Sequence, residues 1–279
     1  MTVFLDDALF TLTWPLPILI IAAGMTFIAL AAYLKKALDS GGASGAWIMG
    51  VIVLWTLRFE GFFVFLLFFV SCTVVGKISG KIRKNQKGDV EGKKGHRRDF
   101  MQVLANGLMT TIAACIWWVS GKNAALIMFG AAVAEATSDT FAGEIGRLSK
   151  KPPVSIRTFR PVPVGLSGGI TVLGTFAAFV SSAVIALAWF LLFQGASFHG
   201  AALVCLMGFA GAVLDSWLGA SVQAHYIDPD TGGLTEHEEK NGMKLELSRG
   251  IRWVDNDMVN LMSNVFSSVF AFGMAALIL

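Results

Sequence analysis

Long apolar runs, separated by short charged or Gly/Pro-rich segments, dominate the chain of 279 residues. The runs approach 20 residues, the length that a helix needs to cross a ~30 Å hydrocarbon layer, whereas buried strands give runs of about 5 to 8 residues. We therefore expect an all-α, polytopic transmembrane helical bundle of about eight spans, forming a single integral membrane domain over residues 1–279. The expected spans are residues 15–34, 43–57, 61–79, 100–119, 123–143, 168–193, 199–221 and 256–279.

The second span, residues 43–57, is the shortest of the eight. Its glycine-rich flank at residues 40–45 is compatible with a half-helix or a re-entrant segment. Non-helical backbone at that depth would have to be buried in protein. The sequence leaves both alternatives open beside a full crossing.

Composition supports a membrane protein. Hydrophobic residues make up 55% of the chain and charged residues 15%, with a mean hydropathy of +0.66, whereas soluble domains average about 25% charged residues. Asp6 and Asp7 precede the first apolar run, and no basic segment does, so we expect no cleaved signal peptide. Cys72, Cys115 and Cys205 lie inside apolar runs without metal-type spacing and are interpreted as small buried side chains.

Basic residues set the expected orientation, because Lys and Arg concentrate in short cytoplasmic loops. With both termini outside, 20 basic residues fall on the cytoplasmic side, and only Arg58 and Lys122 fall on the other. The scheme predicts a basic cytoplasmic loop at about residues 80–98 and a second cytoplasmic loop at about residues 223–255. We expect an integral protein of a prokaryotic plasma membrane whose active face is cytoplasmic.

Four spans carry ionisable or amide side chains near these cytoplasmic ends, which is costly unless the side chains face a bundle interior or a wet cavity. The polar positions are Asp99, Gln102, Asn106 and Thr110; Glu135, Asp139 and Glu144; Asp215 and Ser216; and Asn256, Asp257, Asn260, Ser263 and Asn264. The first set follows one helical face, since its members are three or four residues apart. The sequence therefore predicts one polar site shared by several spans.

Carboxylates that approach one another repel unless a cation or strong hydrogen-bond donors lie between them. Asp139, Glu144 and Asp215 therefore predict a Mg²⁺ site, because Mg²⁺ binds one or two carboxylates together with amide oxygens, water and substrate phosphates. Ion or proton translocation and structural pairing remain alternatives. For Thr110, Ser263 and Asn264 the alternative is hydrogen bonding between helices.

Basic residues and a glycine-rich segment lie close to the same, cytoplasmic ends of the expected spans. Lys94, Arg97 and Arg98 directly precede the polar face at residues 99–110 and could bind phosphate, although a lipid-headgroup patch or a topology signal is also compatible. A glycine-rich turn before the span at 168–193 could offer backbone N–H groups to an anion, although it is not a Walker A motif. Its candidate residues are Gly165, Ser167, Gly168 and Gly169.

At these motifs the sequence resembles the membrane family that contains plant phytyl-phosphate kinase and animal transmembrane protein 19, a domain-of-unknown-function family of the type numbered 92. The resemblance covers about residue 40 to the end. The matching stretches are residues 94–99 with 102–107, 138–146, 165–175, 215–220 with Gln223, and 256–261. Asp257 departs from the pattern, because a second Asn after Asn256 is expected there.

The resemblance implies phosphorylation of a prenyl monophosphate to its diphosphate, with phytyl, geranylgeranyl and polyprenyl chains all open. CTP, ATP or another nucleoside triphosphate would be the donor, and Mg²⁺ the cofactor. Binding partners would be the prenyl monophosphate, the nucleotide and the lipid bilayer, with no nucleic acid. The isoprenoid tail is expected between apolar spans such as 61–79 and 168–193.

In this hypothesis the metal ligands Asp139, Glu144 and Asp215 share the catalytic role with Arg98 and Asp99. The remaining candidates bind substrate or nucleotide: Lys94, Arg97, Gln102, Asn106, Gly165, Ser167, Gly168, Gly169, Ser216, Asn256 and Asn260. Two rivals remain. One is a lipid or ion transporter or flippase, and the other is a CTP-dependent lipid-phosphate cytidylyltransferase, which needs the same metal and phosphate groups.

Overall fold

The computed structural model describes residues 1–83, 97–240 and 242–278. Eight helices lie in this part: α1 (Thr2–Phe10), α2 (Leu16–Leu34), α3 (Ser40–Arg83), α4 (Phe100–Ser120), α5 (Asn123–Gly146), α6 (Val172–Leu192), α7 (Phe198–Ser221) and α8 (Asn256–Ile278). The strands are short: β1 (Val154–Ser155), β2 (Gly169–Ile170), β3 (His225–Ile227), β4 (Leu234–Thr235), β5 (Glu239–Lys240), β6 (Met243–Lys244) and β7 (Leu247–Arg249).

The predicted all-α polytopic membrane fold is confirmed. Within the described residues, α2, α3, α4, α6, α7 and α8 are each long and apolar enough to cross a membrane. Their outer faces expose large apolar side chains such as Phe27, Leu187 and Phe270, as expected of helices whose solvent is lipid. The helix α1, which lies before the first expected span, was not predicted.

The helix α3 is two helices joined at a sharp turn, where Arg58 has non-helical backbone angles (φ 58°, ψ −161°). Both ends of α3 lie at the same end of the bundle. The amide of Asp39, next to the first end, donates to the carbonyl of Arg98 (3.1 Å), and Lys77 Nζ near the second end donates to the carbonyl of Lys35 (3.3 Å). The expected spans 43–57 and 61–79 are therefore the two arms of a helical hairpin, and the first arm is a regular helix from Ser40.

The helix α5 forms the centre of the bundle. It contacts α3, α4, α6, α7 and α8, and every residue from Ala124 to Ser138 is buried. Small side chains fill most of this stretch, so that neighbouring helices approach closely. Because its neighbours enclose it, α5 does not need the continuous apolar surface that a lipid-facing helix needs.

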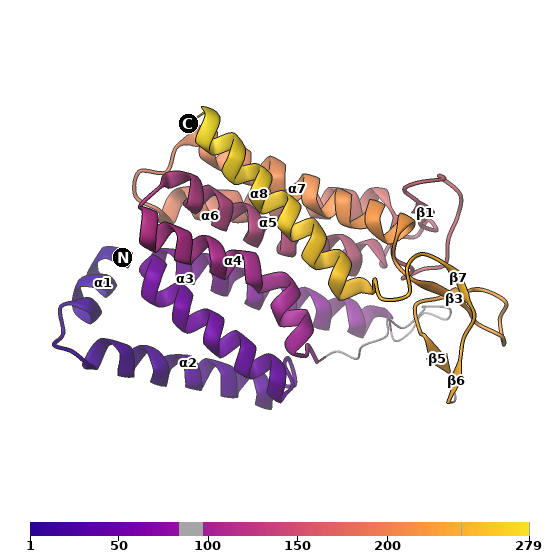
Figure 1. Cartoon of the computed structure of the whole chain (residues 1–279), viewed down its shortest axis with the longest axis horizontal. Coiled ribbons are helices and arrows are strands. Elements are labelled where there is room, and N and C mark those ends of the chain that lie inside the picture. The colour runs from indigo at the N-terminus through magenta and orange to yellow at the C-terminus, as the bar shows by residue number, and fades with distance from the viewer. Residues whose placement is uncertain (84–96, 241, 279) are drawn as a thin grey trace.

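The strands gather at one end of the bundle, and the two termini lie at the opposite end (Figure 1). We call the end with the strands the polar end; α4 and α8 begin there, and α5 and α7 end there. The expected loop at 223–255 contains a three-stranded antiparallel sheet in the order β4-β3-β7, beside a separate β5-β6 pair. Most of the expected basic loop at 80–98, including Lys94, lies outside the described residues.

The sixth span begins later than expected. Residues 169–171 are extended, with β2 pairing antiparallel to β1, and α6 begins at Val172. The Thr171 side chain accepts a hydrogen bond from the amide of Gly174 (3.0 Å) and so caps the helix. The glycine-rich turn therefore precedes a strand and a threonine cap, and it is not itself the N-terminus of the helix.

Gly208 of α7 provides a test of this packing. A Cβ atom there would lie 2.5 Å from both Ala134 Cβ and Ser182 Oγ, whereas a Cβ at Gly273 of α8 would meet nothing within 4 Å. Gly208→Ala should lower the stability of the purified protein by about 1 to 3 kcal/mol through overpacking. Gly273→Ala should raise it by up to about 1 kcal/mol through helix propensity. Thermal unfolding in detergent measures both, and equal effects would contradict the close α5–α7 contact.

Candidate functional site

A cavity of about 420 Å³ opens at the polar end of the bundle. It is lined by residues at the start of α4 and α8, the end of α5 and α7, and the turn before β2. We call it the polar cavity. Thirteen of the sixteen predicted site residues line it: Arg98, Gln102, Asn106, Asp139, Glu144, Gly165, Ser167, Gly168, Gly169, Asp215, Ser216, Asn256 and Asn260.

Two carboxylates on different helices meet in this cavity. The carboxyl groups of Asp139, near the end of α5, and Asp215, near the end of α7, both line the cavity and interact with each other. Asp215 is 8% exposed. Two carboxylates this close share a proton or a cation, because like charges at such a distance cannot both remain uncompensated.

A buried hydrogen-bond network holds Asp215 on the side that faces the interior of the bundle. The hydroxyl of Ser263 lies 3.1 Å from Asp215 Oδ2 and 2.8 Å from Glu135 Oε1. Asn264 Nδ2 donates to Glu135 Oε2 (2.5 Å) and to the carbonyl of Ala132 (2.9 Å). Ser263 and Asn264 therefore bridge α8 to its neighbours, as the hydrogen-bonding alternative predicted. Thr110 is buried, but its hydroxyl has no hydrogen-bond partner within the described residues.

Amide side chains of α8 complete this wall of the cavity. With its side-chain nitrogen facing Asp215, Asn260 donates to Asp215 Oδ2 (3.0 Å) and to the carbonyl of Asn256 (3.0 Å). Asn256 Oδ1 accepts from the hydroxyl of Ser167 (3.4 Å). The first turns of α8 thus connect the carboxylate pair to the glycine-rich turn.

Glu144 lies on another part of the cavity wall. Arg83 Nη2 forms an ion pair with its Oε2 atom (3.1 Å), and the Ser79 hydroxyl donates to the same atom. In the part of the chain that the structure describes, no three His, Cys, Asp or Glu side chains are grouped to hold a metal ion. The predicted ligand roles therefore remain predictions: Asp139 and Asp215 interact with each other, whereas Glu144 pairs with Arg83.

The glycine-rich turn is held from several sides. The amide of Ser167 donates to Glu236 Oε1 (2.7 Å), its hydroxyl accepts from Gln223 Nε2 (3.1 Å), and the amide of Gly169 donates to the carbonyl of Leu166 (3.1 Å). Two of the N–H groups expected to bind an anion therefore already have partners. Gly168 has φ +81°, and a Cβ there would lie 2.5 Å from the amide nitrogen of Ala220, so only glycine fits this contact.

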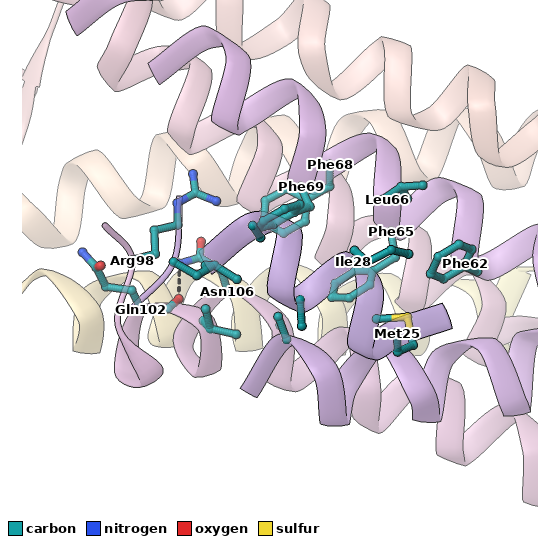
Figure 2. A pocket seen from close by; sticks show the side chains of 16 residues that line it. Met25, Ile28, Phe62, Phe65, Leu66, Phe68, Phe69, Arg98, Gln102 and Asn106 are labelled. Atoms are coloured by element: carbon teal, nitrogen blue, oxygen red, sulfur yellow. Dashed lines mark hydrogen bonds between the residues drawn. The ribbon is translucent and has the colours of Figure 1, made fainter. Parts of the chain in front are cut away.

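Arg98 reaches the cavity from a short extended segment. Its amide donates to the carbonyl of Ala37 (3.0 Å), and its carbonyl accepts from the amide of Asp39 (3.1 Å), which fixes the backbone before α4. Figure 2 shows Arg98, Gln102 and Asn106 together at one end of a neighbouring groove. Asn106 Nδ2 donates to the carbonyl of Gln102 (2.9 Å).

Three predicted residues do not line the cavity. Asp99 is the N-cap of α4, where it forms a capping box with Gln102. Arg97 is exposed, and Lys94 lies outside the described residues. A structural role for Asp99 is therefore visible, and its predicted catalytic role remains a prediction.

Four residues that contribute to the site were not among the predicted site residues: Arg83, Glu135, Arg147 and Glu236. Arg147 lines the cavity, and its Nη2 atom donates to the carbonyl of Gly165 (3.3 Å). Only Glu135 had a local signal, because it lies one turn from Asp139 on the same face of α5.

Comparison with known proteins places the chain in a family. The family described as integral membrane protein DUF92 matches residues 23–268. This chain belongs to the DUF92 family. The recognised resemblance is therefore confirmed at the level of the family.

Relatives of this DUF92 protein occur in archaea and plants. An uncharacterized membrane protein of Methanocaldococcus jannaschii is 36% identical over 197 residues, which are 68% of this chain and 78% of that protein. Protein PGR of Arabidopsis thaliana is 28% identical, over 87% of this chain and 91% of the relative. The chloroplastic protein VTE6 of Arabidopsis thaliana is 26% identical, over 91% of this chain and 70% of the relative. No solved structure matches the chain.

The sheet beside the site should respond to pH through His225. This side chain is buried, its Nδ1 atom donates to the carbonyl of Gln223 (3.0 Å), and burial together with nearby Arg249 lowers its pKa. In the unfolded state the pKa of His225 is about 6.5, so His225 binds a proton at a higher pH there than in the folded state. The sheet should therefore lose stability as pH falls below that value.

Hydrogen exchange of residues 225–249, corrected for the intrinsic effect of pH, should show faster opening at pH 5.5 than at pH 7.5. His225→Gln should reduce the difference, and His199→Gln in α7, at the opposite end, should not. The same pH response in His225→Gln would contradict this assignment.

Proposed function

We propose that this protein is a Mg²⁺-dependent kinase that phosphorylates a prenyl monophosphate to the diphosphate with CTP or another nucleoside triphosphate. The observation that carries the proposal is the meeting of the Asp139–Asp215 pair and Arg98 in one cavity at the end of a membrane bundle. Similarity to the family that includes plant phytyl-phosphate kinase supports the substrate class. The opening of the cavity at one end of the bundle, and not halfway along it, favours a lipid headgroup over a transporter's central site.

The residues of the cavity fit a magnesium ion. Mg²⁺ binds through one or two carboxylates and keeps water and substrate phosphates as its other ligands, so the pair Asp139 and Asp215 would suffice to hold it. When bound, the ion would neutralise charge on the phosphates. Glu144, which forms an ion pair with Arg83, would support the site by positioning the second arm of α3 against α5.

In the proposed reaction an oxygen of the acceptor monophosphate attacks the γ-phosphorus of the nucleotide. The bond from that phosphorus to the β–γ bridging oxygen breaks, and the nucleoside diphosphate leaves with the bond electrons. The acceptor phosphate has a second pKa of about 6 and is largely dianionic near neutral pH, so no general base is needed. Arg98 and Arg147 would bind phosphoryl oxygens, and Asn256, Asn260 and Ser216 would orient them.

Replacement of the paired carboxylates tests the proposal. Purified protein with Mg²⁺, CTP or ATP and a prenyl monophosphate should yield prenyl diphosphate and nucleoside diphosphate, identified by mass spectrometry. Asp139→Asn and Asp215→Asn should each lower the rate by on the order of 100-fold or more, because each removes a charge from the phosphate site. Asp7→Asn, on the exposed surface of α1 at the opposite end, should leave the rate unchanged.

Other products would favour the rival functions. Release of pyrophosphate with a CDP-lipid would identify a cytidylyltransferase. Absence of any turnover, together with an ion flux in vesicles that Asp215→Asn abolishes, would identify a transporter and overturn the kinase.

We further propose that the polar end faces the cytoplasm of a prokaryotic cell and that both termini face outward, because the basic residues concentrate at the polar end. In a variant without native cysteines, a cysteine at Thr11 should react with a membrane-impermeant maleimide in intact cells. A cysteine at Thr231, which is also exposed, should react only after the cells are opened. The reverse pattern would invert the topology.

A further inference from the structure

A second hollow of the molecule is a narrow apolar groove between α2, both arms of α3 and the first turns of α4. We call it the apolar groove. Its wall carries four phenylalanines of α3, namely Phe62, Phe65, Phe68 and Phe69, opposite Met25 and Ala29 of α2. Figure 2 shows these apolar side chains along the groove and the three polar side chains at one end.

The apolar groove and the polar cavity meet. Arg98, Gln102 and Asn106 line both of them. A molecule that fills both would place an apolar part among the phenylalanines and an anionic part next to the Arg98 guanidinium. The occupant that fits this charge pattern is a single-chain lipid with an anionic headgroup.

The groove runs along the helices into the bundle. Ala32 and Met25 both line it and are seven residues apart on α2, as are Phe69 and Phe62 on α3. At a rise of 1.5 Å per residue, the lined length is about 10 Å. Because α2 and α3 are membrane-spanning helices, this direction leads from the polar end toward the middle of the hydrocarbon layer.

The width of the groove restricts what it can hold. Its volume is about 50 Å³, against about 420 Å³ for the polar cavity, so a slender chain fits it better than a ring system. Met25 lies at the far end of the groove, and its methyl group packs over Gly50, where an added Cβ would lie 2.1 Å away (Figure 2). A methionine side chain is flexible and can move aside for an incoming chain.

We propose that the apolar groove binds the isoprenoid chain of the phosphate acceptor, with the monophosphate held at Arg98 and Met25 limiting how far the chain enters. This inference rests on the proposed function for the identity of the headgroup reaction. It differs from the sequence-based expectation for the tail, because the second arm of α3 lines the groove and α6 does not.

A photoreactive probe tests the site without any need for catalysis. The probe is a prenyl monophosphate with a diazirine on its chain, incubated with the full-length protein in detergent and mapped by mass spectrometry after irradiation. Labels should fall within residues 25–32 and 62–69, and excess unlabelled prenyl monophosphate should suppress them at least 10-fold.

Matched variants on one helix sharpen the test. Ala29 lines the groove, whereas Ala23 is exposed on the same helix and does not line it. Ala29→Phe should reduce labelling at least 10-fold, and Ala23→Phe should leave it unchanged. If Ala29→Phe is not obtained as a monodisperse protein, Ala46→Phe fills the same groove from α3 and takes its place.

The outcomes separate this inference from the proposed function. Labels on the outer faces of α6 or α7, or unchanged labelling in Ala29→Phe and Ala46→Phe, would overturn the groove assignment even if turnover is observed. Labelling in the groove without nucleotide-dependent turnover would leave the binding site standing and overturn the kinase.

Discussion

The carboxyl group of Glu135 lies in the centre of the bundle with 2% exposure, and this location constrains everything around it. A carboxyl group at that depth is stable only with hydrogen-bond partners, since an unsatisfied one costs several kcal/mol. Both partner side chains, Ser263 and Asn264, come from α8. The rotation of α8 about its axis is therefore fixed relative to α5, and Ser263 extends the constraint to Asp215 on α7.

This buried network fixes the geometry of the candidate site. Asn260 lies three residues before Ser263, about one helical turn nearer the polar end, and its amide reaches the same Asp215 carboxylate. A change in the register of α8 would move Asn260 and Asn256 together relative to Asp139 and Asp215. The hydrogen bonds around Glu135 thus hold the polar side chains that line the cavity above it.

Small residues leave the space in which the Glu135 side chain is buried. A Cβ at Gly211 of α7 would lie 2.4 Å from Glu135 Cγ, so the side chain of Glu135 occupies space that only a glycine leaves open. Hydroxyl groups also connect neighbouring helices through backbone carbonyls, from Ser138 of α5 to Ala178 of α6 (2.7 Å) and from Ser267 of α8 to Met207 of α7 (2.8 Å). Close packing and hydrogen bonding, and not hydrophobicity, distinguish these contacts from those with lipid.

Local signals in the sequence were enough to locate the spans and the polar end. Run length predicted the long helices, the distribution of Lys and Arg predicted that the basic loops share one end of the bundle, and spacing placed Gln102 and Asn106 on one face of a helix. The contacts of Glu144 with Arg83 and of Ser167 with Glu236 join residues 61 and 69 positions apart, and no periodicity in one chain specifies such pairs. Asp99 had a readable signal, because Asp99 and Gln102 have the spacing of a capping box, and the catalytic interpretation overlooked it.

Arg98 lies where the apolar groove meets the polar cavity, and the proposed reaction needs access to both lipid and water. A nucleotide reaches the protein from water and a prenyl chain reaches it from lipid, so the acceptor phosphate has to lie where an apolar path and a polar cavity meet. Arg98 lines both, and its backbone is paired with residues 37–39 between α2 and α3, which are also the helices of the apolar groove. The same backbone hydrogen bonds therefore hold the wall of the groove and the guanidinium at its mouth. A shift of α2 would alter the space for the chain and the charge that meets its phosphate together.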